Sequence, residues 1–304
     1  GMIASEITIP AALRSGDTVA LVSPSSKVKH EYIDDAAARL RSWGYEVRIG
    51  AHAYGAHGNF AGTPDERLAD LRDALADPSV KAILCTRGGY GAVHLLESLP
   101  PEVIRRNAKW LIGFSDISAL HAAWLRAGVA SLHAPMCKHI AEEAESQEST
   151  CYLRAALEGN MPCYTTPSHW LNRTGEVRAR VVGGNLAVLT GLLRTPYDIF
   201  QEGTILFIED VGERTYKVER MLYNLELCGV LPRLAGLIVG RFTDYNEAPG
   251  MCMTLYEAVW ARVARYSYPV CFDFPVGHVP QNQPMIEGAV ATRTVAPQGV
   301  TLQF

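Results

Sequence analysis

Strand-like runs alternate with amphipathic stretches through the first half of the chain. The runs have the length of strands in a parallel sheet, and they occupy residues 18–22, 46–49, 80–86, 110–114 and 129–134. Between them, apolar residues recur at helical spacing over 31–43, 64–76 and 116–125. Strands that alternate with helices predict a parallel sheet whose right-handed crossovers place helices on both faces.

One helix start is encoded within four residues. Thr63 and Glu66 form a capping-box pattern, with Pro64 at the first helical position. This local signal predicts a helix over 64–76 without reference to the rest of the chain.

The second half of the chain mixes short strands with helices. Its last segments are expected as strands, over 270–275, 285–295 and 300–304. Residues 161–176 contain prolines and show no apolar periodicity, which predicts a linker. We therefore expect an α/β protein with a parallel-sheet domain over 1–160 and a smaller β-rich domain with helices over 177–304.

Composition narrows the classes of partner. The 304 residues are 48% hydrophobic and carry a formal charge of −4, which offers no basic field to a nucleic acid. No apolar run approaches the roughly 20 residues that span a bilayer. We expect neither a nucleic acid nor a membrane as a partner.

The cysteines and the start of the chain indicate the compartment. The seven cysteines are odd in number, scattered and never arranged as CxxC, which is typical of reduced thiols. No charged-then-apolar leader precedes the first predicted strand. Both features predict a cytoplasmic protein.

Ser115 lies where a predicted strand passes directly into a predicted helix. A serine at such a junction projects from the carboxyl end of the sheet, above the free N–H groups of the helix, which suits a nucleophile. Ser115 or Asp116 as a helix N-cap is the alternative interpretation, and this segment alone favours it because serine and aspartate are common caps.

The strand over 80–86 ends in a glycine-rich loop at residues 87–91. Glycines here let backbone N–H groups approach an anion or oxyanion without obstruction by a Cβ atom, although a tight turn requires them equally. The spacing is not GxGxxG and no P-loop lysine follows, so the loop does not favour a nucleotide site.

Two further strand ends carry chemistry. Glu209 and Asp210 end the apolar strand over 204–210, and His278 follows the strand over 270–275. A serine, a carboxylate and a histidine at strand ends supply a nucleophile, an orienting acid and a base. Taken singly, Glu209 is also explained as a surface carboxylate and His278 as a turn residue.

Five separated motifs keep a common order and spacing along the chain. They are SPSS at 23–26, CTRGGYG at 85–91, GFSDIS at 113–118, IEDVGERTYKVERML at 208–222 and PVGHVPQNQP at 275–284. In this order they resemble the LD-carboxypeptidase family of serine peptidases, from about Ile9 to the C-terminus.

The resemblance implies a fold, an activity and a set of catalytic residues. It implies a flavodoxin-like N-terminal domain that carries the nucleophile Ser115, and a C-terminal domain that carries the triad carboxylate Glu209 and the base His278. The implied activity is the release of terminal D-alanine from the L,D bond of murein tetrapeptide in the cytosol, during cell-wall recycling. The muropeptide is then the substrate partner, and no metal or other cofactor is used.

Catalysis also needs groups that bind the oxyanion and the terminal carboxylate of the substrate. We expect the backbone N–H groups of Asp116 and Gly89 to hold the oxyanion, with Gly88 as the alternative to Gly89. Arg87 and Arg214 are both candidates for the carboxylate.

Two other functions stay open. Relatives of the family include self-immunity peptidases that cleave the aminoacyl-nucleotide form of microcin C, and Trp170 is the loop aromatic that could hold a base. The non-catalytic alternative is a two-domain protein that binds a small molecule. A homodimer also stays open as the assembly.

Overall fold

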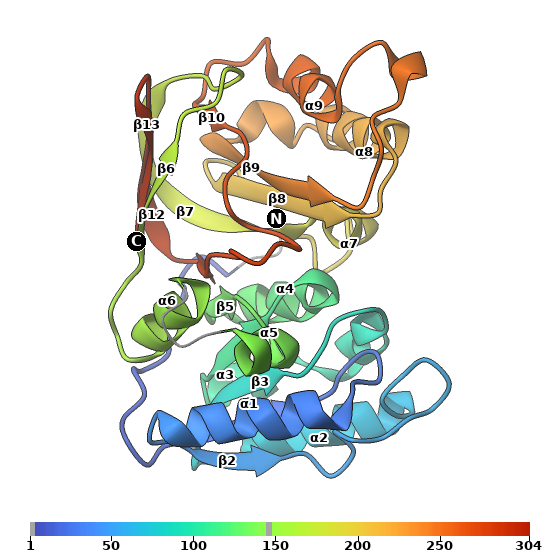
Figure 1. The fold of residues 1–304 in the computed structure, drawn as a ribbon, viewed down its shortest axis with the longest axis vertical. Helices are drawn as coiled ribbons and strands as arrows, with labels where there is room; N and C mark the ends of the chain where they lie inside the picture. Colours follow the sequence, from blue (N-terminus) through green and yellow to red (C-terminus); the bar gives the residue numbers. More distant parts are fainter. Residues whose placement is uncertain (1–3, 144–147) are drawn as a thin grey trace. The chain divides into compact units, whose positions relative to one another are not determined.

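The chain forms two compact units in a computed structural model that describes residues 4–143 and 148–304. The Ser115 unit holds the described residues up to Met161 together with Gln283–Glu287, and the His278 unit holds Pro162–Asn282 with Gly288–Phe304 (Figure 1). Residues 1–3, which begin the expected domain over 1–160, and residues 144–147 of an acidic segment lie outside the described residues. In the described ranges, no helix is both long enough and apolar enough to span a membrane.

A six-stranded sheet in the order β11-β5-β4-β3-β1-β2 forms the centre of the Ser115 unit. Its strands are β1 (Thr18–Val22), β2 (Glu46–Ile49), β3 (Val80–Cys85), β4 (Trp110–Gly113), β5 (Ser131–His133) and β11 (Met285–Glu287). Strands β1 to β5 run parallel in the flavodoxin-like order 2-1-3-4-5, and β11 adds an antiparallel edge. The parallel sheet predicted from the alternating pattern is confirmed.

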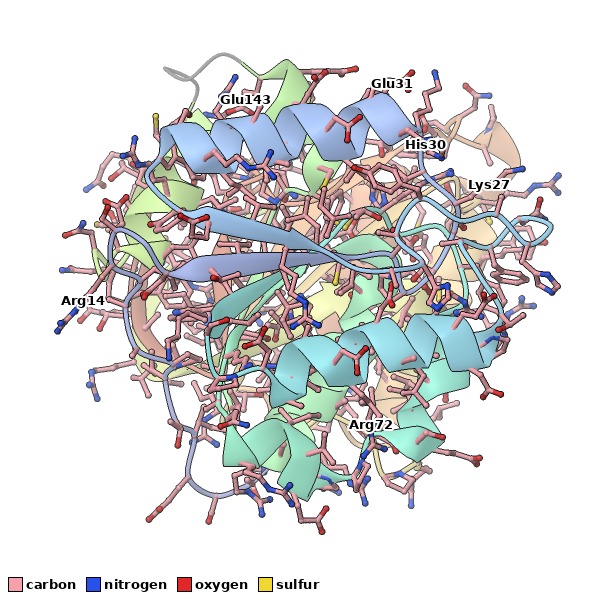
Figure 2. The ribbon with its side chains drawn as sticks, turned by 90° about the horizontal axis from the view of Figure 1, so that it is seen from below. Arg14, Lys27, His30, Glu31, Arg72 and Glu143 are labelled. Atoms are coloured by element: carbon pink, nitrogen blue, oxygen red, sulfur yellow. The ribbon has the colours of Figure 1, made fainter. Side chains whose placement is uncertain are left out.

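Helices cover both faces of this sheet. They are α1 (His30–Ser42), α2 (Pro64–Ala76), the 3₁₀ helix η1 (Ala92–Ser98), α3 (Pro101–Arg106), α4 (Ser118–Ala127), α5 (Cys137–Glu142) and α6 (Glu148–Leu157). Figure 2 shows α1, in pale blue, and α2, in cyan, on opposite sides of the strands. At the start of α2, the side chains of Thr63 and Glu66 each accept a hydrogen bond from the other's backbone N–H, as the capping box predicts.

The parallel register brings the ends of β3 and β4 to one edge of the sheet. Leu84 pairs with Ile112, so the glycine loop after β3 and Ser115 after β4 leave the sheet as neighbours. Strand β4 is buried along its whole length because both faces of the sheet are covered. Ligands of open α/β sheets bind at this carboxyl edge.

A mixed seven-stranded sheet in the order β10-β9-β8-β7-β12-β13-β6 forms the His278 unit. Its strands are β6 (Cys163–Pro167), β7 (Gly175–Asn185), β8 (Ile205–Val211), β9 (Gly236–Thr243), β10 (Val270–Cys271), β12 (Val290–Ala296) and β13 (Gly299–Gln303). Helices α7 (Leu186–Gly191) and α9 (Leu255–Val263) both pack against α8 (Thr215–Leu227). Strands β7 to β10 are parallel and the other three are antiparallel.

The segment over 161–176, expected as a linker, contains a strand. Residues Cys163–Pro167 form β6, which pairs antiparallel with β13 at the edge of the sheet. Only Tyr164 of this strand is buried, so the segment shows no apolar alternation in the sequence. Proline is tolerated because an edge strand has one side without ladder hydrogen bonds.

The predicted strand over 285–295 is also wrong, because it is two strands in two different sheets. Met285–Glu287 is β11 of the Ser115 unit, whereas Val290–Ala296 is β12 of the His278 unit. Gly288, with φ 87°, lies between them. The predicted strand over 270–275 shortens to Val270–Cys271.

Candidate active site

Ser115 lies at a sharp turn between a buried strand and a helix. Phe114 remains extended with φ −152°, and Ser115 then adopts φ 64° at the start of a 3₁₀ turn, η2 (Ser115–Ile117). A positive φ is strained for a residue with a side chain and persists only where the surroundings impose it. A serine on a strained strand-to-helix turn has the geometry of a nucleophile elbow.

The helix N-cap positions of this segment fall on neither Ser115 nor Asp116. The N-cap positions are Phe114 for η2 and Ile117 for α4, and neither makes a side-chain cap hydrogen bond. The Asp116 carboxylate instead accepts hydrogen bonds from two other loops. The turn at Ser115 delays the regular helix, which begins only at Ser118.

The glycine loop after β3 packs against this turn. A Cβ atom on Gly88 would lie 3.2 Å from Ser115 Cβ and 3.4 Å from the Asp116 backbone nitrogen, which is tighter than side chains normally allow. Gly89 has φ 87°, and a Cβ atom there would overlap the Ser26 hydroxyl at 2.1 Å. Neither the Gly89 N–H nor the Asp116 N–H donates a hydrogen bond to another described residue. Both groups are backbone hydrogen-bond donors, which is what stabilisation of an oxyanion requires.

In the His278 unit, a fully buried carboxylate lies against the predicted base. Glu209 on β8 has no exposed surface, and its Oε2 lies 2.9 Å from His278 Nδ1. Burial alone lowers the pKa of His278, but the hydrogen bond and charge of Glu209, with the charges of Asp210 and Asp244, leave that pKa raised. Because a carboxylate only accepts, Nδ1 carries a proton, and Nε2 of the neutral ring is the nitrogen that can take one.

The backbone before His278 requires glycine. Gly277 has φ 138°, and a Cβ atom there would lie 2.7 Å from the Arg241 carbonyl oxygen and 3.4 Å from Glu209 Oε2. The Gly277 N–H donates to Asn282 Oδ1 at 3.0 Å. These contacts fix the loop that brings the imidazole to Glu209.

Asp210 has different surroundings from its neighbour. Its carboxylate accepts hydrogen bonds of 2.8 to 3.0 Å from the Asn185 amide and from two backbone N–H groups, one of them at the start of α7. Burial raises the pKa of Asp210 to about 6. Adjacent residues on a strand point to opposite faces, so the structure brings Glu209, and not Asp210, to His278.

The two candidate arginines lie in different units. Arg87 is exposed in the Ser115 unit, and its guanidinium donates to the backbone carbonyl of Lys27 at 2.6 Å. Figure 2 labels Lys27 just before α1, beside His30 in its first turn. Arg214 is exposed at the N-cap position of α8 in the His278 unit. Both stay candidates for binding the substrate carboxylate.

The sequence analysis missed a buried network beside the glycine loop. Arg67 on α2 is 1% exposed, and its guanidinium donates to the carbonyls of Pro24, Gly62 and Gly91. A signal for it exists in the sequence, because α2 buries one helical stripe, and this stripe comprises Arg67, Asp70, Leu71, Ala74 and Leu75.

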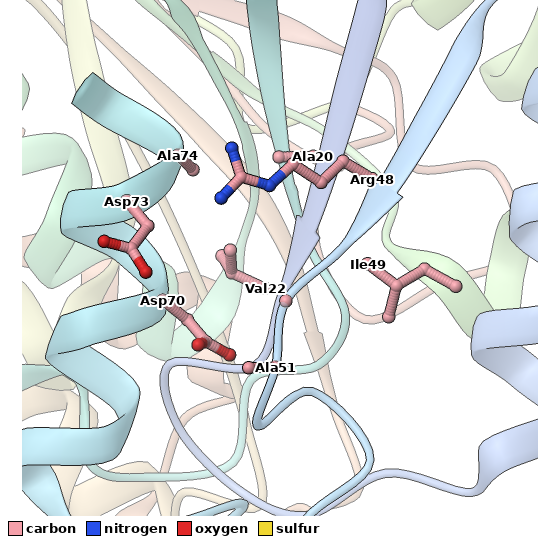
Figure 3. A pocket seen from close by; sticks show the side chains of 9 residues that line it. Ala20, Val22, Arg48, Ile49, Ala51, Asp70, Asp73 and Ala74 are labelled. Carbon is pink, nitrogen blue, oxygen red and sulfur yellow. The ribbon is translucent and has the colours of Figure 1, made fainter. Parts of the chain in front are cut away.

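A cavity of about 200 Å³ opens elsewhere in the Ser115 unit, between α2 and strands β1 and β2. Figure 3 shows Asp70 and Asp73 on α2, facing Arg48 on β2. Burial raises the pKa of Asp70, whose carboxylate accepts the His52 N–H at 2.8 Å. None of the predicted catalytic residues lines this cavity.

The described part of the chain also contains no cluster of three or more His, Cys, Asp or Glu arranged to hold a metal ion.

Trp170 is exposed in the His278 unit. Its side chain is 74% exposed and stacks on His169, with ring centroids 6.1 Å apart, and His169 in turn stacks on Phe272 at 5.6 Å. Trp170 follows β6, within the segment that the sequence predicted as a linker.

Comparison with known proteins identifies the family of both units. The chain matches the LD-carboxypeptidase N-terminal domain over residues 19–134 and the LD-carboxypeptidase C-terminal domain over residues 178–292. It is 32% identical over 302 residues to the probable murein peptide carboxypeptidase of Bacillus subtilis, which covers 97% of this chain and 94% of the relative.

Solved structures share the fold. The muramoyltetrapeptide carboxypeptidase from Oxalobacter formigenes superposes with a TM-score of 0.86 at 26% identity, covering 94% of this chain and 98% of that one. The microcin C7 self-immunity protein MccF, in complex with aspartyl sulfamoyl adenosine, gives a TM-score of 0.87 at 21% identity and covers 98% of each chain, a likeness of fold alone. The two domain matches and the relative from Bacillus subtilis show that this chain belongs to the LD-carboxypeptidase family.

Proposed function

We propose that this chain is a serine carboxypeptidase that hydrolyses the L,D peptide bond of murein tetrapeptide and releases terminal D-alanine. The observation that carries the chemistry is the buried Glu209 carboxylate, 2.9 Å from Nδ1 of His278, which orients a histidine as a general base. The substrate class is inferred from the relatives named murein peptide and muramoyltetrapeptide carboxypeptidase.

In this mechanism Ser115 Oγ attacks the scissile carbonyl while His278 Nε2 takes its proton. Glu209 holds the ring in the required tautomer and stabilises the imidazolium. The Gly89 and Asp116 N–H groups bind the oxyanion of the tetrahedral intermediate. His278 then returns the proton to the amine of D-alanine as it leaves, and water hydrolyses the acyl-enzyme by the same steps.

A carboxypeptidase must also recognise a free carboxylate, and an arginine does so through two parallel hydrogen bonds. Arg87 and Arg214 are the proposed donors, because both guanidinium groups are exposed at residues that flank the two catalytic segments in sequence. Single substitutions to methionine separate them. Substitution of the arginine that binds the carboxylate should raise KM for the tetrapeptide far more than KM for a C-terminally amidated analogue.

We further propose a cytoplasmic location, a muropeptide as the partner, and no binding of nucleic acid or membrane. None of the seven cysteines, all of which are described residues, forms a disulfide, in keeping with a reducing compartment. A homodimer is the assembly to test, by sedimentation of the purified chain.

The second candidate is a peptidase that cleaves the amide of an aminoacyl nucleotide, as in self-immunity to microcin C. The exposed Trp170 favours it, because an indole face held by stacked rings is suited to bind a nucleobase. A non-catalytic binding protein is disfavoured by the oriented histidine.

One experiment separates these functions. Purified protein is incubated with murein tetrapeptide and, in parallel, with an aminoacyl sulfamoyl adenosine, and the products are weighed by mass spectrometry. Tripeptide and D-alanine from wild type, absent with Ser115→Ala, support the proposal. Cleavage of the adenosine analogue alone supports the second candidate, and binding without turnover supports a binding protein.

A further inference from the structure

One oxygen of the Asp116 side chain joins two loops that border Ser115. Asp116 Oδ2 accepts hydrogen bonds from Ser25 Oγ at 2.7 Å and from the Ala92 N–H at 2.9 Å, and the residue is only 6% exposed. Ser25 belongs to the turn after β1, and Ala92 follows the glycine loop. The residue next to the nucleophile therefore holds both loops.

Arg67 also donates hydrogen bonds to these two loops. Its Nη1 donates to the carbonyls of Pro24 at 2.7 Å and Gly91 at 2.9 Å. These carbonyls immediately precede the two donors to Asp116 in the chain. Burial raises the pKa of Asp116, while its hydrogen bonds and the charge of Arg67 oppose that rise. The charge of buried Arg67 thus stabilises the Asp116 carboxylate, although the two side chains do not form a direct ion pair.

The turn that contains Ser25 also fixes the conformation of Gly89. The Ser26 N–H donates to the Gly88 carbonyl, and Ser26 Oγ accepts the Tyr90 N–H, both at 3.1 Å. Gly89 lies between these two anchored residues. A change at Ser25 is therefore transmitted to the Gly89 N–H.

We propose that the Asp116 carboxylate is a positioning group of the active site, which through Ser25 and Ala92 fixes the glycine loop relative to Ser115. The inference rests on the proposed function, in which Gly89 and Asp116 donate their N–H groups to one oxyanion. Two donors on separate loops act together only if their spacing is fixed before the reaction begins. The Ser25–Asp116 hydrogen bond supplies that spacing.

The expected signature is a loss of kcat with little change in KM, because the oxyanion is absent from the bound substrate and develops in the transition state that leads to the tetrahedral intermediate. Loss of one oxyanion donor lowers kcat by about 10²- to 10³-fold, and a displaced donor is expected to lose less. We expect Ser25→Ala to lower kcat on the order of tenfold to a hundredfold, and Asp116→Ala to lower it further.

Two further variants separate positioning from simple stabilisation. In Asp116→Asn the amide oxygen can accept both hydrogen bonds, because both end on one oxygen, so this variant should recover most of the kcat lost in Asp116→Ala. Ser23→Ala is the matched control. Ser23 is a buried serine two residues earlier, and its hydroxyl bonds to the Ala53 carbonyl and Thr86 Oγ1, each at 2.7 Å, and not to Asp116.

The experiment measures kcat and KM for D-alanine release, the melting temperature, and the rate at which a fluorophosphonate labels Ser115. In labelling, Ser115 Oγ bonds to phosphorus, the P–F bond breaks, fluoride leaves and the base takes the serine proton. The phosphoryl oxygen occupies the oxyanion site, so this rate reports on the glycine loop whatever the natural substrate is.

Slower labelling and lower kcat in Ser25→Ala than in Ser23→Ala, at similar melting temperatures, support the inference. Equal labelling and equal kcat in these two variants overturn it, even if Asp116→Ala fails to fold. Labelling of wild type without D-alanine release rejects the proposed substrate, and the labelling rates then decide the inference alone. No labelling and no release by wild type reject both.

Discussion

The positive φ angle of Ser115 costs free energy, and the surrounding structure must offset it. For a residue with a side chain, a sparsely populated backbone region costs about 1 to 3 kcal/mol. Ser115 holds φ 64° because the buried strand β4 precedes it and α4 follows almost at once. Because Ser115 is the N-cap residue of neither helix, the strained turn favours the prediction that its side chain is kept for chemistry.

Ser115→Ala should therefore abolish D-alanine release with little change in melting temperature. Loss of a triad nucleophile lowers kcat by about a millionfold, whereas Ser115 is the N-cap residue of neither η2 nor α4. Ser115→Gly should be equally inactive and melt no lower than Ser115→Ala, because glycine adopts positive φ without strain. Calorimetry and kinetics of the three proteins check this. Normal turnover by Ser115→Ala would show that Ser115 is not the nucleophile.

Glu209 and Asp210 should respond differently to loss of charge. Glu209→Gln removes the charge that stabilises the imidazolium, so we expect kcat/KM to fall roughly a thousandfold or more. Asp210→Asn should lower kcat/KM less than about tenfold, by analogy with residues outside a triad. Asp210→Asn should still destabilise the fold. The amide nitrogen would face an N–H group that now donates a hydrogen bond to the carboxylate, and two donors cannot pair. If Asp210→Asn is the more damaging to kcat/KM, the assignment of the orienting acid is wrong.

The pH profile of kcat/KM should report the raised pKa of His278. Only the neutral ring can accept the serine proton, so activity is absent at low pH and rises as pH passes that pKa, above the ordinary value of about 6.5. In Glu209→Gln the charge of Glu209 no longer raises this pKa, while the burial that lowers it stays and only the smaller effects of the Asp210 and Asp244 charges still raise it. The acid limb of the residual activity should thus move to lower pH. An unchanged or higher limb would mean that another group controls the titration.

At the scale of elements, the loop before His278 offers a paired test. Gly277→Ala adds a Cβ atom 2.7 Å from the Arg241 carbonyl, in a position that also needs positive φ. Gly203→Ala adds strain at φ 78° with nothing within 4 Å of the new Cβ. We expect both to lower stability, by about 1 to 3 kcal/mol for the strain alone. Only Gly277→Ala should lower kcat, at least tenfold, because the imidazole moves with its loop. Similar kcat values for both variants would show that the loop tolerates displacement.

Elements defined by nearby residues were predictable from the sequence, and those defined by distant partners were not. Helix α2 begins as predicted because Thr63 and Glu66 contain the whole instruction for its start. Strand β11 has no such local signal, since it is only three residues long and is separated from β12 only by Gly288 and one further residue. Its identity depends on pairing with β5, about 150 residues earlier in the chain.

The same distinction applies to the candidate site. Ser115, Glu209 and His278 could be proposed from sequence because each follows or ends a recognisable strand. The hydrogen bond between Ser25 and Asp116 could not, because it joins residues 91 positions apart through side chains on two loops. Arg67 was missed for another reason. Its position on the stripe of α2 that includes Leu71 and Leu75 was a signal, but a charged residue on such a stripe is expected to be exposed unless its partners are known.

At the scale of the whole molecule, the proposed catalytic groups are distributed over two units that the chain enters more than once. It leaves the Ser115 unit after Met161, returns for Gln283–Glu287 and leaves it again. A chain cut after residue 161 would keep Ser115 but lose β11, which exposes the edge of β5. The intact chain is therefore the unit on which activity must be tested.

The final prediction concerns what this intact chain needs in order to work. A serine nucleophile, an oriented histidine and two N–H donors complete acyl transfer without a Lewis acid. We therefore expect wild-type protein to trim murein tetrapeptide to tripeptide at the same rate with and without EDTA. Ser115→Ala measured under both conditions corrects for any contaminating metallopeptidase, whose activity the chelator would remove from both samples. Release that stops with EDTA, returns with zinc and still depends on Ser115 would show that a metal ion takes part in the step assigned here to the oxyanion donors.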